Sequence, residues 1–484
     1  MEYELIVGLE VHAELNTRTK MFCGCLNDPN ERHPNVNICP ICMGHPGTLP
    51  VMNRDAVGRV IRVGLALGGE ITASNFFDRK NYFYPDLPKG YQISQYKYPI
   101  VSGGNLNGIR ITRVHLEEDA GRLAHTKEAT LVDYNRAGVP LMELVTEPDI
   151  RGSAEARQFG EELQLLLRYI GASDADMEKG QMRVEANISL RPKGSQEFGT
   201  KVEIKNINSF RAAEKAIEYE IKRQTEMLEK SEKVRQETRG WDDVKEITVH
   251  QRFKEEAHDY RYFPEPDLPP LTLTKEAGFD IEGLRDTLPE LPWDKRTRFT
   301  DDFGIPEKQA EVFVRDRVLA GYFESAASEL YEWLDDRTDE NVKRARTLLA
   351  NYLTSDFINL LQQKGTTIPE CRVTPENFAE LIKMIYSKEI SSRVAKDVLS
   401  LMFENGADPS DIVREHDLSQ VSNQSEMESI IKKIIEEHPG PVADYKSGKE
   451  NAIQFLVGQV MKKTKGKTNP QVAREVLTNL IKTA

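Results

Sequence analysis

Hydrophobic and polar positions alternate along the first part of the chain and recur at helical spacing in the second. Alternation bounded by Gly, Pro and Asn turns predicts strands over residues 5–15, 108–116, 130–134, 182–190 and 201–207. Helical spacing between them predicts helices over residues 53–67, 153–171 and 209–230. The last helix begins cleanly, because Ser209 is a suitable N-cap. Strands mixed irregularly with helices predict an α+β fold rather than a doubly wound sheet.

Breaks in the pattern predict three domains. Prolines gather between residues 264 and 292, and beyond Trp293 strand signals nearly vanish. Helical spacing then runs through residues 303–334, 341–362 and 374–405. The turn at residues 405–409 is a strong breaker, and the segment after it is again helical. We therefore expect domains at 1–292, 293–407 and 408–484 in a chain of 484 residues.

Acidic side chains occur where strand alternation would direct them to one face. On the first strand Glu10 and His12 point to the same side, whereas Leu9 and Val11 point into a core. Four more acidic stretches follow, at residues 115–119, 141–147, 183–187 and 201–205. Several acids and a histidine on an ordered sheet are what a Mg²⁺–nucleotide site requires. The chain contains neither G-x-G-x-x-G nor G-x-x-x-x-G-K-[ST], so any ATP is held in another way.

Each of these residues also has a structural interpretation. Glu143 sits inside the apolar run 139–145, where a charge is costly unless a cation or a structural ion pair offsets it. His12 alone could be a satisfied structural histidine, and the run Glu117–Asp119 could be a solvated turn. Lys80, in the aromatic-rich segment 78–86, could neutralise a phosphate or a substrate carboxylate. Composition alone favours a surface turn for that segment.

Four of the five cysteines cluster as Cys-x-Cys and Cys-x-x-Cys, which predicts a metal site. Two short-spaced pairs can present four thiolates tetrahedrally to a structural Zn²⁺, namely Cys23, Cys25, Cys39 and Cys42. A redox pair and unliganded thiols are the alternatives. Cys371 stands apart in an expected loop and has no assigned role.

Composition and charge add one candidate site, in the last residues of the chain. A hydrophobic content of 39% with 30% charged residues is ordinary for a soluble protein. No apolar run approaches the roughly 18–20 residues that cross a bilayer, and no signal peptide is read, so we expect a cytoplasmic protein without membrane contact. The formal charge is −13, yet residues 461–484 are basic. They suggest a phosphate contact through Lys462, Lys463, Lys465 and Lys467, with a solvated terminus as the alternative.

Long motifs resemble one known family. Residues 7–15, 78–86, 115–121, 140–149 and 455–459 closely resemble the B subunit of the glutamyl-tRNA(Gln)/aspartyl-tRNA(Asn) amidotransferase. The resemblance spans essentially the whole chain. It implies an N-terminal cradle domain with a fold like the glutamine synthetase core, then an all-α helical domain and a small all-α tail that binds tRNA.

The resemblance also implies a reaction and partners. In that family the B subunit uses ATP to phosphorylate the side-chain carboxylate of mischarged Glu-tRNA(Gln) or Asp-tRNA(Asn), and ammonia then displaces the phosphate. A heterotrimer performs the reaction: an amidase subunit (A) frees ammonia from glutamine, a small subunit (C) wraps the other two, and the ammonia travels through a tunnel. This chain has no amidase-like serine-rich motif, so the glutamine-splitting nucleophile is expected on another chain.

Roles follow for single residues. A carboxylate attacking ATP brings negative charges together, so Mg²⁺ and a cation must offset their repulsion. We expect His12, Glu118 and Glu143 to bind Mg²⁺, and Lys80 to bind the phosphate or the substrate carboxylate. Catalytic roles beside Lys80 fall to Glu10, Glu117 and Glu185. The four clustered cysteines, which only some family members keep, would hold structural zinc in the loop 23–42.

Two rival functions remain at this stage. The chain could be a zinc-bearing tRNA adaptor whose acids form structural ion pairs, in which case it would not hydrolyse ATP. It could also be a ligase, similar to glutamine synthetase, that uses free ammonia. The sequence does not decide between Glu-tRNA(Gln) and Asp-tRNA(Asn) as the substrate.

Overall fold

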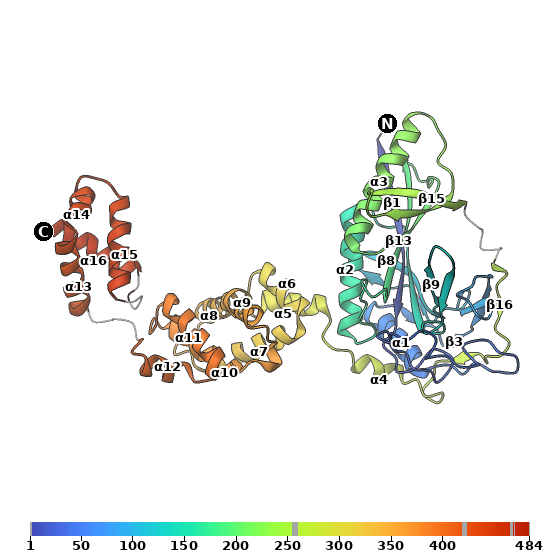
Figure 1. Cartoon of the computed structure of the whole chain (residues 1–484), viewed down its shortest axis with the longest axis horizontal. Coiled ribbons are helices and arrows are strands. Elements are labelled where there is room, and N and C mark those ends of the chain that lie inside the picture. Colours follow the sequence, from blue (N-terminus) through green and yellow to red (C-terminus); the bar gives the residue numbers. More distant parts are fainter. Residues whose placement is uncertain (1, 254–259, 419–423, 465–467, 469, 484) are drawn as a thin grey trace. The chain divides into compact units, whose positions relative to one another are not determined.

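Contacts within the chain divide it into two units, Met1–Pro292 and Trp293–Ala484. The computed structural model describes residues 2–253, 260–418, 424–464, 468 and 470–483 (Figure 1). The first unit is built around a large sheet, and the described residues of the second are helical. This confirms the α+β fold class.

The large sheet has ten strands, and β1 (Tyr3–Glu14) lies near its centre. On one side of β1 follow β12 (Met182–Pro192), β13 (Val202–Ile207), β14 (Glu237–Asp242) and β15 (Ile247–Phe253). On the other side follow β11 (Pro140–Thr146), β8 (Ile109–Glu118), β6 (Val101–Ser102) and β2 (Glu70–Ile71), with β7 (Asn105–Leu106) also paired to β8. Neighbouring strands are antiparallel except β13 and β14, which are parallel.

The two faces of β1 have different environments. Leu5, Val7, Leu9, Val11 and Ala13 are at most 8% exposed and form part of the core. The alternate residues of β1 point to the other face, which carries the acids. Helix α3 (Phe210–Glu229) packs against β12 and against α2 (Ser153–Tyr169), and both lie along the sheet in Figure 1. As predicted, the Ser209 side chain caps α3, accepting a hydrogen bond from the Ala212 amide.

Smaller elements complete the first unit. A three-stranded sheet joins β16 (Phe263–Pro264), β4 (Asp78–Asn81) and β5 (Tyr91–Ser94). Two pairs of strands are β9 (Arg122–His125) with β10 (Thr130–Asp133), and β3 (Ser74–Asn75) with β17 (Leu271–Thr272). Helix α1 (Arg54–Ala66) packs against β8, and against α4 (Ile281–Asp286). Composition had favoured a surface turn for residues 78–86, yet residues 78–81 form the central strand of the small sheet.

The second unit contains two hydrophobic clusters. The first is built from α5 (Pro292–Asp301), α6 (Glu307–Arg315), α7 (Arg317–Glu332), α8 (Asp339–Tyr352), α9 (Ile358–Lys364), α10 (Pro375–Tyr386), α11 (Ser392–Asn405) and α12 (Pro409–Glu415). A π-helical segment, Leu353–Phe357, joins α8 to α9. The second cluster is built from α13 (Gln424–Glu437), α14 (Pro439–Lys446), α15 (Asn451–Lys463) and α16 (Pro470–Thr483). Because Val413 belongs to the first cluster and Met427 to the second, the boundary between the two clusters lies between these two residues.

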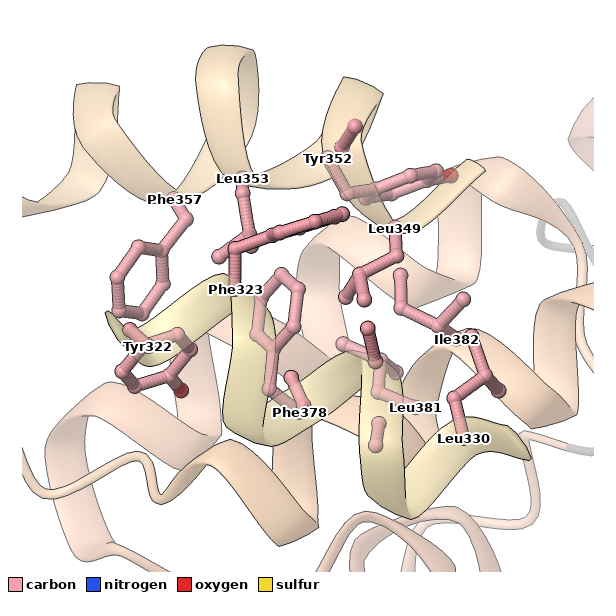
Figure 2. Packing of buried hydrophobic residues seen from close by; sticks show 14 of the residues in the cluster. Tyr322, Phe323, Leu330, Leu349, Tyr352, Leu353, Phe357, Phe378, Leu381 and Ile382 are labelled. Atoms are coloured by element: carbon pink, nitrogen blue, oxygen red, sulfur yellow. The ribbon is translucent and has the colours of Figure 1, made fainter. Parts of the chain in front are cut away.

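Aromatic rings hold the first of these clusters together. Figure 2 shows Phe323 between the helix that carries Leu349 and Leu353 and the helix that carries Phe378. The ring of Phe323 is fully buried and stacks on Phe313 at 4.5 Å between centroids. Phe357, from the π-helical segment, contacts Phe378 edge to face at 5.2 Å. Such pairs add to the stability gained from burying their area.

We expect Phe323→Ala to lower the free energy of unfolding by about 3–5 kcal/mol, because the cavity left by the ring is only partly refilled. Denaturant unfolding of the full chain would measure the change. Val318 lies on the same helix but is 51% exposed, so Val318→Ala is the control and should change the value by less than about 0.5 kcal/mol. Equal effects of the two substitutions would contradict this view of the core.

Candidate active site

A row of titratable side chains crosses three central strands of the sheet. His12 on β1 lies directly opposite Glu143 on β11, and Glu143 lies directly opposite His115 on β8. Residues in such register point to the same face. The Glu143 carboxylate oxygen Oε2 is 3.4 Å from His12 Nε2 and 3.5 Å from His115 Nε2. The apolar run 139–145 therefore places one carboxylate between two imidazoles.

Two further carboxylates approach His12 from neighbouring rows. His12 Nε2 is 3.6 Å from Glu10 Oε1 and 3.6 Å from Glu117 Oε1. Ser94 Oγ, from β5, donates a hydrogen bond of 3.1 Å to Glu117. Ligand atoms of Glu10, His12 and Glu143 lie within 4.8 Å of one another, and so do those of His115, Glu117 and Glu143. We call Glu10, His12, His115, Glu117 and Glu143 the acidic site. Its oxygen-rich donor set suits a hard divalent cation.

Charge is unbalanced within the acidic site. Burial and the neighbouring Glu143 raise the pKa of Glu10 to about 7, and the same two causes raise the pKa of Glu117. Burial alone would lower the pKa of His12, but the carboxylate of Glu143, helped by Glu117 and Glu10, raises it to about 9. Burial lowers the pKa of His115 to about 4, so this ring is neutral. Repulsion among carboxylates held this closely can be relieved by bound protons or by a cation.

Lys80 brings a positive charge to the acidic site from the small sheet. It lies on β4, which is fixed to the β16 segment by paired hydrogen bonds of 2.7 and 2.9 Å from Arg79 to Glu265. Burial would lower the pKa of Lys80, but the charges of Glu117 and Glu143 raise it well above its ordinary value. Lys80, Glu10 and Glu143 line one cavity of about 190 Å³. The structure thus brings this predicted residue to the acids.

Aromatic side chains also line that cavity, and none of them was expected there from the sequence. Tyr96 and Tyr262 stack with centroids 4.5 Å apart and planes inclined by 12°. Tyr260 also lines the cavity, with Lys80 Nζ 5.1 Å from its ring centroid. Tyr260 and Tyr262 lie directly before β16, which pairs with β4, some 180 residues earlier in the chain, and that pairing was not visible in the sequence.

More acids lie at the β12 side of the cavity. Glu185, directly opposite Glu10, forms an ion pair of 2.7 Å with Lys205. Glu203 accepts a hydrogen bond of 2.7 Å from Thr238 Oγ1. Ligand atoms of Glu10, Glu185 and Glu203 lie within 4.8 Å of one another. Glu185 is therefore beside the acidic site, as expected, but its charge is already balanced by Lys205.

Glu118 is the predicted magnesium ligand that the structure does not bring to His12 and Glu143. Successive residues of β8 point to opposite faces, so Glu117 faces the acidic site and Glu118 faces away. Glu118 Oε2 is 2.6 Å from Lys89 Nζ, and Oε1 accepts a hydrogen bond of 2.9 Å from the Ile93 amide. It lines a different cavity, of about 210 Å³, beside Cys42. Glu117 therefore takes the place expected of Glu118.

The four clustered cysteines converge in the loop after β1. One sulfur atom from each of Cys23, Cys25, Cys39 and Cys42 lies within 4.8 Å of the others, and all are free thiols. Cys39 and Cys42 have their sulfurs 3.9 Å apart. The contact with Cys23, and then the charge of Lys20, lower the pKa of Cys42 to about 4. Such an arrangement of thiols suits a tetrahedral metal.

Lys20 accompanies the cysteine cluster and was not singled out by the sequence analysis. It is fully buried, an unusual position for a lysine. Its Nζ lies 3.8 Å from Cys42 Sγ and donates a hydrogen bond of 3.1 Å to the Tyr134 carbonyl. A buried ammonium is costly unless it is paired, so the sulfur atoms are its expected counter-charge.

The basic tail is described only in part. Lys462 and Lys463 are exposed at the end of α15, and Lys463 forms an ion pair of 2.6 Å with Glu437. The other two lysines assigned to this patch, Lys465 and Lys467, lie outside the described residues. None of the helices that the structure describes is long and apolar enough to cross a lipid bilayer.

Comparison with known proteins gives full-length matches. A family model described as the GatB/GatE catalytic domain matches residues 5–278, and one described as the GatB domain matches residues 337–481. A protein of Thermoanaerobacter sp. (strain X514) is 48% identical over 99% of both chains. Others are 47% identical over the whole of both chains, from Persephonella marina, and 45% identical over 98% of this chain and 97% of its own, from Gloeothece citriformis. All three are named as the B subunit of an aspartyl/glutamyl-tRNA(Asn/Gln) amidotransferase.

Proposed function

Since the chain belongs to the family of aspartyl/glutamyl-tRNA(Asn/Gln) amidotransferase B subunits, we propose that it activates the side-chain carboxylate of a mischarged tRNA with ATP and amidates it. The substrates are Glu-tRNA(Gln), Asp-tRNA(Asn) or both, and the products are Gln-tRNA(Gln) and Asn-tRNA(Asn). The observation that carries this proposal is the acidic site together with Lys80, inside the residues that match the catalytic domain.

Activation makes a poor leaving group into a good one. The substrate carboxylate oxygen attacks the γ-phosphorus of ATP, the bond from that phosphorus to the β–γ bridging oxygen breaks, and ADP leaves. Ammonia then attacks the acyl carbon, inorganic phosphate leaves, and the nitrogen loses a proton. The Lys80 ammonium, which lines the same cavity as Glu10 and Glu143, offsets the negative charge that gathers when carboxylate and triphosphate meet.

The donor set fits Mg²⁺. His12 and Glu143 would hold the ion, with Glu10 and Glu117 beside them, and the ion would neutralise the triphosphate charge. Glu118 is not proposed as a ligand, because its carboxylate is bound to Lys89. A ligating imidazole must be unprotonated, so His12 would give up the proton that its carboxylate neighbours favour.

Zinc fits the cysteine cluster. Four thiolates around Zn²⁺ at about 2.3 Å place neighbouring sulfurs about 3.8 Å apart, and the observed Cys39–Cys42 distance is 3.9 Å. Four thiolates with one Zn²⁺ carry two net negative charges, and the Lys20 ammonium would offset part of this charge. The role proposed for zinc is to hold the loop 23–42 in place.

Partners follow from the same proposal. An amidase subunit would supply ammonia through a tunnel, and a small third subunit would complete a heterotrimer. The acyl phosphate reacts with water, so ammonia must arrive without passing through bulk solvent. A cytoplasmic location suits a translation enzyme of this kind.

The deciding experiment is to co-purify the chain with its partner subunits and to assay both mischarged tRNAs. With glutamine as donor, the complex should form Gln-tRNA(Gln), Asn-tRNA(Asn) or both, and ATP hydrolysis should require Mg²⁺ and the mischarged tRNA. An adaptor would bind tRNA without hydrolysing ATP. A ligase that uses free ammonia would amidate with ammonium in the absence of the amidase subunit and gain nothing from glutamine in its presence.

The tail is proposed to bind tRNA. Because α12 packs into the first cluster of the second unit, truncation after Leu418 removes the α13–α16 helices and leaves that cluster intact. We expect this truncation to raise the KM for tRNA at least tenfold, with glutaminase activity and zinc content unchanged. Unaltered binding of mischarged tRNA at physiological salt would refute the proposal.

Single lysines provide a finer test of the tail. The logarithm of the binding constant falls linearly with the logarithm of the salt concentration, and each lysine that contacts a phosphate adds about 0.7–0.9 to the steepness of this slope. Lys462→Ala should lower that slope, and Lys449→Ala is the control, because Lys449 is also exposed in this module but pairs with Asp444 at 2.9 Å. Phosphate contacts carry no sequence information, so the loss should be equal for both tRNAs.

A further inference from the structure

A buried polar cluster lies behind the cavity of the acidic site, on the face of the large sheet that α3 covers. At its centre is Glu220 of α3, whose side chain is fully buried. A buried carboxylate is costly unless its charge is paired and hydrogen-bonded. The neighbours that meet this condition come from α3, β14 and β15. We call these residues the polar hub: Glu220, Arg223, Gln224, Arg239 and Thr248.

Both oxygens of the Glu220 carboxylate are bound within the polar hub. Arg223 donates one hydrogen bond of 2.8 Å to each oxygen, and Gln224 donates one of 3.0 Å. These two partners lie on the same helix, so they fix the carboxylate on α3. From β15, the Thr248 hydroxyl donates a hydrogen bond of 2.6 Å to it. From β14, Arg239 Nε lies 3.3 Å from it. Glu220 therefore ties the last two strands of the sheet to α3.

Arg239 joins these two strands to each other inside the polar hub. Its guanidinium donates hydrogen bonds of 2.8 Å to both the hydroxyl and the carbonyl oxygen of Thr248, and one of 2.9 Å to Glu237. Among the described residues, β15 is the outermost strand on its side of the sheet, and the pair β14–β15 is bonded to the other strands through β13. The polar hub is therefore a further attachment for an edge of the sheet.

Thr238 connects the polar hub to the cavity on the other face. Successive residues of a strand point to opposite faces, so Glu237 and Arg239 face α3 and Thr238 faces the cavity, which it lines. Thr238 lies opposite Glu203 in the parallel pairing of β13 with β14 and donates a hydrogen bond of 2.7 Å to its carboxylate. Both side chains are buried, and Glu203 lines the same cavity. One ligand-facing carboxylate is thus held by a strand that the polar hub holds in turn.

We propose that Glu220 is a positioning residue for the amidation: it holds β14 and, through Thr238, the Glu203 carboxylate in the cavity where the substrates meet. This inference rests on the proposed function. A charge in a small cavity acts strongly on the other charges there, because little water screens it. Misplacing a group by about 1 Å can cost about 10²-fold in rate. Hydrogen bonds are directional and apolar contacts are not, so a polar hub suits this task.

Three substitutions along this path test the proposal in the assembled complex. Glu220→Gln removes the central charge. Thr248→Val removes the hydroxyl that binds Glu220, and Thr238→Val removes the hydrogen bond to Glu203; both keep the shape of the side chain. We expect kcat for ATP-dependent amidation to fall at least tenfold in Glu220→Gln and at least fivefold in each valine variant. The KM for mischarged tRNA should not change, since the tail is proposed to bind tRNA.

Conservative variants and a matched control separate positioning from stability. Thr248→Ser and Thr238→Ser keep the hydroxyl and should retain at least half of the wild-type kcat. Glu214→Gln is the control, because Glu214 also lies on α3 but forms its ion pair, of 3.1 Å, with Arg157 of α2 instead of with the hairpin. Its kcat should stay within twofold of the wild-type value. Zinc content and glutaminase activity report that each variant is folded and assembled.

Combining the two valine variants tests whether both act through Glu203. If Thr248 acts by holding Thr238 in place, the double variant should lose at most twofold more than the worse single variant. Independent sites would instead give losses that multiply. Losses that multiply would overturn the inference, because the polar hub would then act on something other than the hydrogen bond from Thr238 to Glu203.

Hydrogen exchange of the β14 and β15 amides gives a readout that does not need the reaction. Glu220→Gln and Thr248→Val should speed this exchange, whereas Thr238→Val should not, because its side chain lies beyond the attachment to α3. Faster exchange or a lower Tm with unchanged kcat would show that the polar hub only stabilises the fold, and would overturn the inference. So would unchanged exchange in both hub variants. A wild-type complex that does not amidate would overturn the proposed function, whereas normal wild-type amidation with unaffected variants would overturn this inference alone.

Discussion

Replacing Glu143 by glutamine is expected to abolish ATP-dependent amidation, with a loss of at least 10³-fold in rate, or about 4 kcal/mol in the activation free energy. Glutamine keeps the shape of the side chain and removes the charge that lies between His12 and His115 at 3.4 and 3.5 Å. The same substitution removes a proposed ligand of Mg²⁺. His12→Ala should give a similar loss, because both residues are proposed to hold the same ion.

Two measurements separate this loss from misfolding. Glutaminase activity of the assembled complex should remain, since glutamine cleavage is proposed to lie on another chain. Glu147→Gln is the matched control, because Glu147 is also an acid near the end of β11 but is bound by Thr112 at 2.7 Å, away from the acidic site. Amidation at the wild-type rate with ammonium as donor, in either Glu143→Gln or His12→Ala, would disprove the assignment.

The second large effect is expected from the cysteine cluster. Purified protein should contain about one Zn²⁺ per chain, and Cys39→Ser should lose it. Structural zinc contributes to folding free energy directly, so the variant should melt several degrees lower and assemble less well with its partners. Cys371→Ser is the control: Cys371 packs beside the first cluster of the second unit, far along the chain from the other four cysteines, and its loss should not change the zinc content.

Substitution of Lys20 provides a second test of the zinc site. Lys20→Met keeps the buried stem and removes the ammonium 3.8 Å from Cys42 Sγ. Zinc should then be released to a chelator at least tenfold faster, whereas Lys20→Arg should lose less. Elemental analysis and chelator competition measure both effects. A zinc-free wild-type protein of unchanged stability would show that the cysteines do not serve a metal.

The sequence predicts local structure well and long-range pairing poorly. Alternation on β1 was sufficient to place Glu10 and His12 on one face, and the cost of a charge in an apolar run singled out Glu143. Alternation counted from His115 would have selected Glu117 rather than Glu118. Glu117 is two positions from His115 and shares its face, whereas Glu118 points to the opposite face. In the first unit the helix bounds agree within a few residues, as for α3, where the Ser209 cap fixes the start. In the second unit the expected helical runs 303–334 and 374–405 are each divided into two helices.

The rest depends on contacts between distant residues. Lys80 reaches the acids only because β4 pairs with β5 and with the β16 segment. The sequence of residues 78–86 does not indicate that pairing. Tyr262 reaches Tyr96 in the same way. The burial of Lys20 depends on a carbonyl more than a hundred residues away, at Tyr134. These residues are ordinary in their sequence context and become informative only in the folded chain.

The central position of β1 has a consequence for synthesis on the ribosome. Both strands that pair with β1 come much later in the chain, at residues 140–146 and 182–192. Because the chain is synthesised at about 5–20 residues per second, the apolar face of β1 stays without its partner strands for on the order of ten seconds or more. Sheets with such long-range pairing fold slowly. The nascent chain is therefore expected to need shielding by a chaperone until residue 192 has emerged, and the acidic site cannot exist before β11, at residues 140–146, has emerged.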